Sequence, residues 1–386
     1  MSKKTVVVGL PMLLRGGTEI QTLALVRILI KLECRVIVCC YYEYDAEMVE
    51  EFRKEGGEVV FLNLARTDGR TTFGQMARLF LNLRTFFRSA SPSVVHVQYV
   101  APGFIPIIAA RWAGVKKVLA TIHYPRHSLG TREAFLVRMA ARFCDGFFCN
   151  SLATERSWFG SGILFDGKKK TEGLSHSTVY NAVDIEAVER AVQQVDKRVL
   201  KGKYGLSNVA VVGVVARLLS EKGHEFLLKA MKQVLSSAPR TKLIVVGAGP
   251  DATSLRQLAD RLEIAESVAW SGGKSQREAF EFYGVMDVLV VPSIFEGFGL
   301  SAAEGMAAGL PVIASNIDGL QEVVLDGVTG ILVQLDDVQG LASSILSILA
   351  DTEEASRMGK RGRARVEEFF SVERFRRAIA TVYELP

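Results

Sequence analysis

The sequence predicts an α/β protein made of two doubly wound, Rossmann-like parallel-sheet domains that face a central cleft. Short, continuously apolar runs alternate with helical patterns from end to end, which is typical of βαβ units with buried parallel strands. This alternation pauses once, in a polar stretch near the middle of the 386 residues, and then starts again. The repeated series indicates two domains of similar architecture.

The first series gives an N-terminal domain at residues 1–182. Its strands are expected at Thr5–Leu10, Arg35–Cys40, Glu58–Leu64, Val94–Tyr99, Val118–His123, Gly146–Asn150 and Thr178–Tyr180. Its helices are expected at Glu19–Lys31, Gln75–Ser89, Ile105–Ala113 and Glu133–Phe143. Because the strands are rich in Val, Ile and Phe without polar alternation, both faces of their sheet should be covered.

The second series gives a C-terminal domain at residues 183–365, with the boundary near Asn181–Asp184. Its strands are expected at Val209–Val215, Lys242–Val246, Ser267–Ser271, Val288–Pro292, Pro311–Ala314 and Gly330–Val333. Residues 366–386 end a charged, amphipathic tail, and we expect them to form a helix that packs back toward the N-terminal domain.

Charge divides the chain unevenly. The net charge is +5, but residues 1–180 carry +9 and residues 181–386 carry −4, which suggests a different partner for each half. The five cysteines form no C-x-x-C pair and lie mostly in apolar runs, as expected of reduced thiols in a cytoplasmic protein. We expect neither a signal peptide nor a transmembrane helix, because no apolar run is long enough.

The most informative motif is a pair of glutamates around a glycine turn. Glu296 should end an apolar strand, and Glu304 lies in the following helix with seven residues between them. The turn Gly297–Leu300 opens onto a helix N-terminus, where backbone amides suit a phosphate. Two carboxylates beside it suit neutral hydroxyls, such as those of a sugar and a ribose joined by a diphosphate. The motif therefore indicates a nucleotide-sugar site.

The same turn also fits a dinucleotide fingerprint. Gly297, Gly299 and Ala302 have the G-x-G-x-x-A spacing, and Asp318 lies about twenty residues on, where a ribose-binding acid is expected. An NAD-dependent dehydrogenase is therefore an alternative. It is disfavoured because the motif comes late in its domain and because Glu296 would repel a pyrophosphate.

Other candidate residues lie at the predicted carboxyl ends of strands. Gly16 and Gly17 follow the first strand, where glycines let a ligand approach the backbone, although they also suit an ordinary βα turn. His123 ends the fifth strand; a lone histidine is more often structural than functional, but a position at the carboxyl end of a strand narrows that preference. Arg217 and Lys222 lie in one βα loop and suit a diphosphate, although a solvated basic turn would look the same.

Taken in order, these motifs resemble family 4 of the retaining glycosyltransferases, which have the two-domain GT-B fold. The resemblance covers nearly the whole chain. It rests on GGTE, TIHYP, VYNAVD, ARLLSEKGHEFLLKA, VVGAGP, and EGFGLSAAE followed by GLPVIAS. The chain departs from the family at Glu33-Cys34, where Gly-His is common, and at Ala182 in the linker.

The resemblance implies a role for each matching residue. Arg217 and Lys222 would bind the donor diphosphate, and Glu304 would bind the ribose hydroxyls. Glu296 and the amides of Phe298, Gly299 and Leu300 would hold the donor sugar and its phosphate. His123 would touch the donor sugar near the reacting carbon, and Gly16 and Gly17 would let the acceptor domain close on the diphosphate.

The implied function is the transfer of a sugar, with retention, from a nucleotide diphosphate sugar to a hydroxyl acceptor. No Asp-x-Asp and no His/Cys cluster occurs, so we expect neither a metal nor another cofactor. Same-face attack is favoured over a covalent carboxylate intermediate, and Glu296 is expected to position the donor. A nucleotide-sugar epimerase on the same fold is a second alternative.

The acceptor is expected to bind the basic first domain, and nucleic acid is not an expected partner. Gln75–Ser89 combines Leu79, Phe80, Leu83, Phe86 and Phe87 with Arg78, Arg84 and Arg88. Such a helix could pack on the core with a basic edge, or rest on an anionic membrane together with Lys168, Lys169 and Lys170. The second interpretation predicts a peripheral membrane protein with a lipid-linked saccharide as acceptor.

Overall fold

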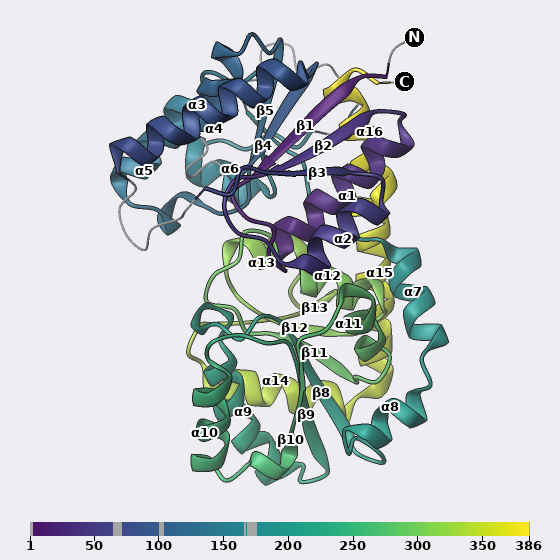
Figure 1. The fold of residues 1–386 in the computed structure, drawn as a ribbon. Helices are drawn as coiled ribbons and strands as arrows, with labels where there is room; N and C mark the ends of the chain where they lie inside the picture. Colours follow the sequence, from purple (N-terminus) through teal and green to yellow (C-terminus); the bar gives the residue numbers. More distant parts are fainter. Residues whose placement is uncertain (1–2, 65–71, 100–103, 166, 168–175, 386) are drawn as a thin grey trace. The chain divides into compact units, whose positions relative to one another are not determined.

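The structure is a computed structural model that describes residues 3–64, 72–99, 104–165, 167 and 176–385. The chain divides into two compact units, Met1–Ala182 with Glu373–Pro386, and Val183–Val372. Each unit is a parallel sheet flanked by helices (Figure 1). The predicted fold class of two doubly wound α/β domains is confirmed. The last fourteen residues belong to the first unit, and the second unit extends to Val372.

The first unit contains a seven-stranded sheet in the order β3-β2-β1-β4-β5-β6-β7. Its strands are β1 (Thr5–Leu10), β2 (Arg35–Cys40), β3 (Glu58–Phe61), β4 (Val94–Gln98), β5 (Lys117–Ile122), β6 (Gly146–Cys149) and β7 (Ser177–Thr178). Its helices are α1 (Gly17–Lys31), α2 (Ala46–Lys54), α3 (Phe73–Ala90), α4 (Phe104–Trp112), α5 (Thr131–Ala141), α6 (Leu152–Phe159) and, from residue 373 on, α16 (Val372–Tyr383).

The strands of this sheet are buried on both faces. Val6, Val7 and Val8 of β1 are all fully buried, although successive side chains of a strand point to opposite faces. Val7 belongs to the core on the face covered by α3, α4 and α5. Val6 and Val8 therefore point to the opposite face of the sheet. A sheet whose two faces are both buried requires strands that are apolar at every position, which is the pattern of this sequence.

The apolar side of α3 packs into the core of the first unit. Leu79, Leu83 and Phe87 are buried, and Phe80 and Phe86 are half-buried against the same core. The core-packed interpretation therefore holds for these five side chains. A membrane surface on α3 would have to use other residues. Lys168, Lys169 and Lys170 lie outside the described residues.

The second unit contains a six-stranded sheet in the order β10-β9-β8-β11-β12-β13. Its strands are β8 (Ala210–Val215), β9 (Thr241–Val246), β10 (Val268–Gly272), β11 (Val288–Val291), β12 (Val312–Ser315) and β13 (Gly330–Val333). Its helices are α7 (Ile185–Gln194), α8 (Lys197–Lys203), α9 (His224–Ser237), α10 (Ala252–Arg261), α11 (Gln276–Tyr283), α12 (Leu300–Ala307), α13 (Asp318–Val323), α14 (Val338–Ala350) and α15 (Thr352–Phe369).

The structure corrects several predicted boundaries. β11 ends at Val291, so Glu296 follows it by five residues and does not end the strand. β3 ends at Phe61, and β5 ends at Ile122, one residue before His123. The charged tail forms two helices, and the last of them, α16, begins at Val372 rather than at residue 366. Polar residues occur both at the ends of strands and in the short loops that follow them. An apolar run therefore shows where a strand or helix lies more accurately than it shows at which residue the element ends.

The two departures from the family pattern have simple local explanations. Glu33 follows α1 with φ of 59°, the left-handed conformation that glycine adopts without strain. The linker is held by Gln21 of α1, whose amide accepts from the Ala182 N–H at 2.8 Å and donates to the Ala182 carbonyl at 2.7 Å. Asp184 then caps α7 by accepting from the Ala187 N–H.

Candidate functional site

The turn between β11 and α12 is packed tightly from behind. Gly299, the N-cap of α12, has φ of 95°, and a Cβ there would collide with Leu320 of α13. A Cβ on Gly319 of α13 would collide with the carbonyl of Glu296. Phe298 is buried with its ring against Phe370 at 5.1 Å between centroids. The glycines therefore let α13 fix the turn in one conformation.

The amides of this turn form the start of a helix. Leu300 is the first residue of α12, and Gly299 offers no side chain to cap it. The first N–H groups of a helix have no partner within the helix and carry the positive end of its dipole. The Phe298–Leu300 segment is thus placed to bind an anion.

The β8–α9 loop brings Lys222 to the same turn. The Lys222 ammonium donates to Glu296 Oε1 at 2.6 Å, and the Ser293 hydroxyl donates to the same oxygen at 3.2 Å. The side chains of Lys222 and Glu296 are only 16% and 17% exposed, so water screens the pair weakly. The two loops are also joined by the Ile294 N–H, which donates to the Glu221 carbonyl at 2.9 Å.

Two glycines in neighbouring loops make this arrangement compact. Gly223 has φ of 67°, and a Cβ there would collide with the Pro292 carbonyl. A Cβ on Gly249, in the loop after β9, would collide with the Leu218 carbonyl. The GAGP sequence, weak evidence by itself, therefore marks a place where two strand-end loops pack backbone against backbone.

Arg217 is more loosely held than Lys222. Its guanidinium lies 3.7 Å from Glu221, and the side chain is 55% exposed. An exposed pair of this length contributes little to stability. Arg217 can therefore turn toward a ligand at small cost.

Glu304 lies on α12 and is 8% exposed. The Tyr283 hydroxyl donates to its Oε2 at 3.0 Å, and the Gln276 amide donates to its Oε1 at 3.4 Å. Burial raises the pKa of Glu304 from 4.5 to about 7, against the lowering by these two hydrogen bonds. A carboxyl that titrates near neutral pH is unusual and points to a functional group.

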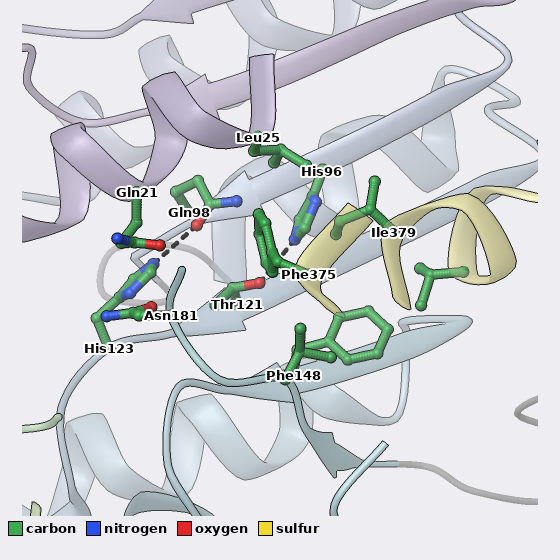
Figure 2. A pocket seen from close by; sticks show the side chains of 12 residues that line it. Gln21, Leu25, His96, Gln98, Thr121, His123, Phe148, Asn181, Phe375 and Ile379 are labelled. Carbon is green, nitrogen blue, oxygen red and sulfur yellow. Dashed lines mark hydrogen bonds between the residues drawn. The ribbon is translucent and has the colours of Figure 1, made fainter. Parts of the chain in front are cut away.

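In the first unit, His123 sits just after β5 beside a small cavity of about 30 Å³ (Figure 2). Its Nε2 is 2.8 Å from Oε1 of the Gln98 side chain, and the His123 backbone carbonyl accepts from the side-chain amide of Asn150. Burial lowers the pKa of His123 to about 3, so the ring is neutral. Its Nδ1 has no hydrogen-bond partner in the described part of the chain.

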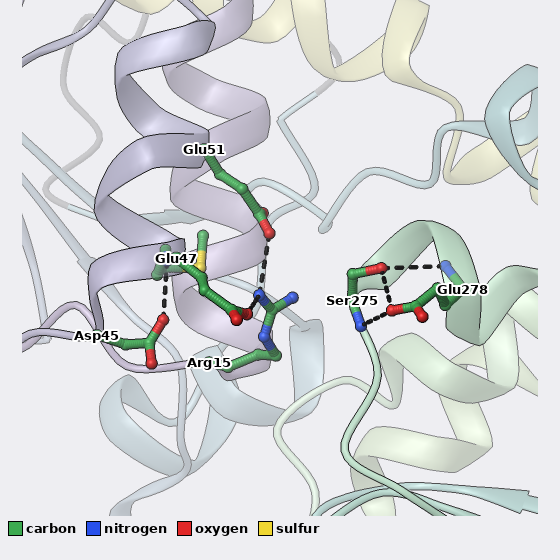
Figure 3. Close-up of polar contacts among 7 residues, drawn as sticks. Arg15, Asp45, Glu47, Glu51, Ser275 and Glu278 are labelled. Atoms are coloured by element: carbon green, nitrogen blue, oxygen red, sulfur yellow. Dashed lines mark hydrogen bonds and ion pairs between the residues drawn. The ribbon is translucent and has the colours of Figure 1, made fainter.

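The Gly16–Gly17 turn begins α1. Gly16 is the N-cap in an extended conformation, and a Cβ on Gly17 would meet nothing within 4 Å. The residue before them, Arg15, forms ion pairs with Glu51 at 3.0 Å and Glu47 at 3.4 Å, which tie the turn to α2 (Figure 3). The turn is thus open on the side of Gly17.

Within the second unit, the structure brings Lys222, Glu296 and the turn at Phe298–Leu300 together, with Arg217 in the same loop as Lys222. Sequence reasoning missed Ser293, Tyr283 and Gln276 here and Gln98 in the first unit. Gln98 is the last residue of β4, and Ser293 follows the end of β11 by two residues. A polar residue at the carboxyl end of a strand is a signal that sequence analysis can use to find a site. Tyr283 and Gln276 carry no motif, and only the fold reveals their contact with Glu304.

Two family models match the chain. The model described as Glycosyltransferase Family 4 matches residues 15–163, and the model described as Glycosyl transferases group 1 matches residues 196–365. A GDP-mannose-dependent monoacylated alpha-(1-6)-phosphatidylinositol monomannoside mannosyltransferase of Corynebacterium glutamicum is 30% identical over 281 residues, which are 68% of this chain and 69% of that protein.

The chain belongs to the group 1 glycosyl transferases of family 4. A GDP-mannose-dependent mannosyltransferase of Mycolicibacterium smegmatis that acts on phosphatidylinositol monomannoside is 33% identical over 171 residues, which are 42% of this chain and 45% of that protein. The chain spans about half the length of the first curated relatives it matches.

Solved structures support the GT-B fold of this chain. The Anabaena HepE protein, solved with UDP and glucose, superposes with a TM-score of 0.82 at 20% identity over 98% of this chain and 99% of that chain. None of the relatives described here is an epimerase or a dehydrogenase. Asp318, the ribose-binding acid of the dehydrogenase interpretation, is the first residue of α13.

Replacing Gly223 by Ala should be more costly than the same change at Gly327. Both glycines have φ of 67°, but a Cβ on Gly327 meets nothing within 4 Å. Gly327→Ala should therefore lower the free energy of unfolding only by the cost of a left-handed backbone conformation, about 1–2 kcal/mol. Gly223→Ala must also push Pro292 away, so its loss in thermal stability should be clearly larger. Equal melting temperatures for the two variants would contradict the packing described.

Glu304→Gln should stabilise the ligand-free protein above neutral pH. The folded state binds the Glu304 proton more tightly than the unfolded state, because its pKa is about 7 rather than 4.5. Stability from this group is therefore present below pH 4.5 and is lost as the pH rises through 7. The variant should gain up to roughly 3 kcal/mol over the wild type at pH 8 and nothing at pH 4.5.

Thermal unfolding of both proteins across this pH range measures the effect. The exposed Glu225→Gln on α9 is the matched control and should show no such gain. A difference between wild type and Glu304→Gln that does not vary with pH would show that the carboxyl ionises normally.

Proposed function

We propose that this protein is a retaining glycosyltransferase that moves a sugar from a nucleoside diphosphate sugar to a hydroxyl of a saccharide or lipid-linked acceptor. The observation that carries the proposal is the arrangement in the second unit. Two carboxylates of different environment, Glu296 and Glu304, flank a helix N-terminus that lies beside Lys222. Such a site offers hydrogen-bond acceptors for two sets of hydroxyl groups, and positive charge lies between the two carboxylates.

The donor is bound by five kinds of contact. Glu304 accepts hydrogen bonds from the ribose hydroxyls, and Arg217 and Lys222 hold the diphosphate. The amides of Phe298, Gly299 and Leu300 bind its oxygens, as helix N-termini do. Glu296 accepts from the donor sugar and forms an ion pair with Lys222. For the first unit we keep the roles that the family resemblance implies, a contact of His123 with the donor sugar and of Gly16 and Gly17 with the diphosphate.

The reaction replaces one C–O bond by another at the anomeric carbon. The bond to the diphosphate breaks, and the acceptor oxygen attacks from the same face, so the configuration is retained. The acceptor's proton passes to the departing phosphate oxygen. Negative charge develops on that phosphate, where Lys222, Arg217 and the α12 N-terminus stabilise it. We propose that these groups suffice and that no metal takes part.

Two features bear on the choice of donor and acceptor. The corynebacterial and mycobacterial relatives use GDP-mannose and act on phosphatidylinositol mannosides, whereas the Anabaena structure contains UDP and glucose. We therefore propose a hexose donor carried by GDP or UDP. A lipid acceptor would require the protein to meet a membrane. Among the described residues no helix has the length and apolarity needed to cross a bilayer.

The neighbouring helices α3, α4 and α5 offer a surface for peripheral contact. They expose large apolar side chains, namely Phe73, Leu81, Trp112, Phe135 and Leu136. On the side of α3 that faces away from the core, Leu81 lies with Arg78 and Arg88, and all three side chains are exposed. Glu133 is the only acidic residue in the three helices. We propose that this apolar and basic surface rests on anionic lipid.

Glu304→Gln and Glu296→Gln should affect different steps. Glu304→Gln should weaken binding of free UDP or GDP about 10-fold or more, because a charged hydrogen bond contributes about 1.5–3 kcal/mol. Glu296→Gln should leave that affinity nearly unchanged and lower the rate of transfer. Calorimetric titration of UDP and GDP, with turnover of their hexose conjugates, measures both.

The exposed Glu225→Gln is the control, and turnover is measured with and without EDTA. Equal weakening of free-nucleotide binding by both site variants would refute the division of roles. Loss of turnover in EDTA, restored by Mg²⁺ or Mn²⁺, would refute the metal-free mechanism. Absence of any binding of UDP and GDP would refute the donor site itself.

Changing Arg78 and Arg88 together to Glu should detach the protein from anionic vesicles. Each basic side chain near an anionic surface contributes about 1 kcal/mol, so the double reversal should lower vesicle affinity by on the order of 100-fold or more at low salt. Co-sedimentation with phosphatidylserine vesicles measures it. Lys229→Glu with Lys232→Glu on α9 changes the net charge equally and should have little effect. Equal losses from both double variants would mean that net charge alone, and no particular surface, governs binding.

A further inference from the structure

Glu304 is held by one neighbouring helix through both of its carboxylate oxygens. Tyr283 of α11 donates to Oε2 at 3.0 Å, and Gln276 of the same helix donates to Oε1 at 3.4 Å. Neither residue belongs to the motifs that identify the family. Tyr283 is 1% exposed, and a hydroxyl at such depth requires a partner, which Glu304 supplies.

The geometry of α11 explains how it reaches both oxygens. Gln276 and Tyr283 are seven residues apart, which is nearly two helical turns, so they project from one face. The start of the helix is fixed by a capping box, in which Glu278 accepts from the Ser275 N–H at 2.8 Å and Ser275 accepts from the Glu278 N–H at 3.3 Å (Figure 3). Its other end, at Gly284, packs closely on Val192 and Val195.

We infer that Tyr283 and Gln276 are positioning residues, which hold the Glu304 carboxylate in its ionised form with one fixed donor on each oxygen and the remaining lone pairs directed to a ribose diol. This inference rests on the proposed function, because it assigns the ribose of the donor to Glu304. It goes further by making α11, which contains no motif residue, the element that sets the pH range over which the nucleotide binds.

The electrostatics of Glu304 come from this contact and from burial. Burial raises its pKa, whereas the hydrogen bonds from Tyr283 and then Gln276 lower it. Burial and the Glu304 charge raise the pKa of Tyr283 well above 10, so the phenol remains a donor. Without its two donors, Glu304 would be protonated over most of the physiological range and would be a poorer acceptor for hydroxyls.

The other elements packed against α12 do not supply this control. β11 and β12 have no titratable residue. α13 meets α12 through Leu320, and α15 meets it through Gly362. Charged side chains on α7 and α15 form ion pairs of their own, among them Glu186–Arg190, Glu189–Arg363 and Glu354–Arg361. In the described part of the second unit, no charged side chain contributes to the pKa shift of Glu304.

The experiment compares the wild type with Tyr283→Phe in two measurements. The carboxyl ¹³C signal of Glu304, assigned by its loss in Glu304→Gln, gives the pKa without any ligand. Calorimetric titration of UDP and GDP from pH 5.5 to 9 gives the binding profile. Removing one hydrogen bond from a carboxylate should raise the pKa by roughly half a unit to one unit. Binding at pH 7 should then weaken about 2-fold to 5-fold and recover to within about 2-fold at pH 9.

Two further variants separate positioning from general damage. Tyr204→Phe removes a phenol that packs on Phe282 in the same unit, and it should leave both profiles unchanged. Gln276→Leu changes a half-buried residue at the start of α11, and it should shift both midpoints upward by less than Tyr283→Phe does. In the background of Glu304→Gln, Tyr283→Phe should cause no further pH-dependent loss.

The outcomes distinguish this inference from the proposed function. Unchanged Glu304 pKa values in both Tyr283→Phe and Gln276→Leu would overturn the inference, as would weakening that is equal at every pH. A shifted pKa in a wild-type background that binds neither UDP nor GDP would instead overturn the ribose-binding role of Glu304. Should Tyr283→Phe fail to fold, Gln276→Leu alone decides the question.

Discussion

The candidate site depends on backbone packed directly against backbone at the ends of the second unit's strands. Gly223 lies against Pro292, Gly247 against Ala216, and Gly319 against Glu296, and a Cβ at each glycine would collide with a carbonyl oxygen. Loops that touch through their main chains leave few alternative conformations. Lys222 and the turn at Phe298–Leu300 therefore belong to different segments of the sequence but form one rigid group.

Rigidity matters because the groups it fixes are costly to bury. Lys222 and Glu296 are both largely removed from water, and each is tolerable only because the other is close. Glu304 forms no ion pair within the described part of the chain, and its pKa near 7 expresses the cost of holding a carboxylate there. A sequence selected for stability alone would have an apolar residue at this position. A site that must accept hydrogen bonds from hydroxyls retains the acid and loses stability for it.

Much of this could be predicted from sequence, and the reasons are physical. Buried parallel strands must be apolar on both faces, so runs such as those at Thr5–Leu10 and Arg35–Cys40 located strands to the residue. The order of the glycine and glutamate motifs identified the family. The ends of strands were less accurate: Glu296 lies beyond β11 because Pro292 and Ser293 already belong to the turn. Contacts between elements were not predictable, since nothing in the local pattern of α11 indicates that Tyr283 meets Glu304.

The charge distribution shows why net charge alone does not locate a binding site. Residues 181–386 carry a net charge of −4, yet they contain the group that we propose binds a diphosphate. Screening limits the influence of scattered surface acids to about 8–10 Å, whereas Lys222, Arg217 and the α12 N-terminus act over a few ångströms, and Lys222 is largely removed from water. The net charge of +9 on residues 1–180 is spread over a surface. On α3, for example, the exposed Arg78 and Arg88 have no acidic neighbour on the helix. Charge that is spread over a surface suits a partner that is itself an extended surface. Charge that is concentrated on rigid loops suits a small ligand. Under the proposed function, the two halves of the chain would use electrostatics at different distances, and only the second would require the precise packing that its glycines provide.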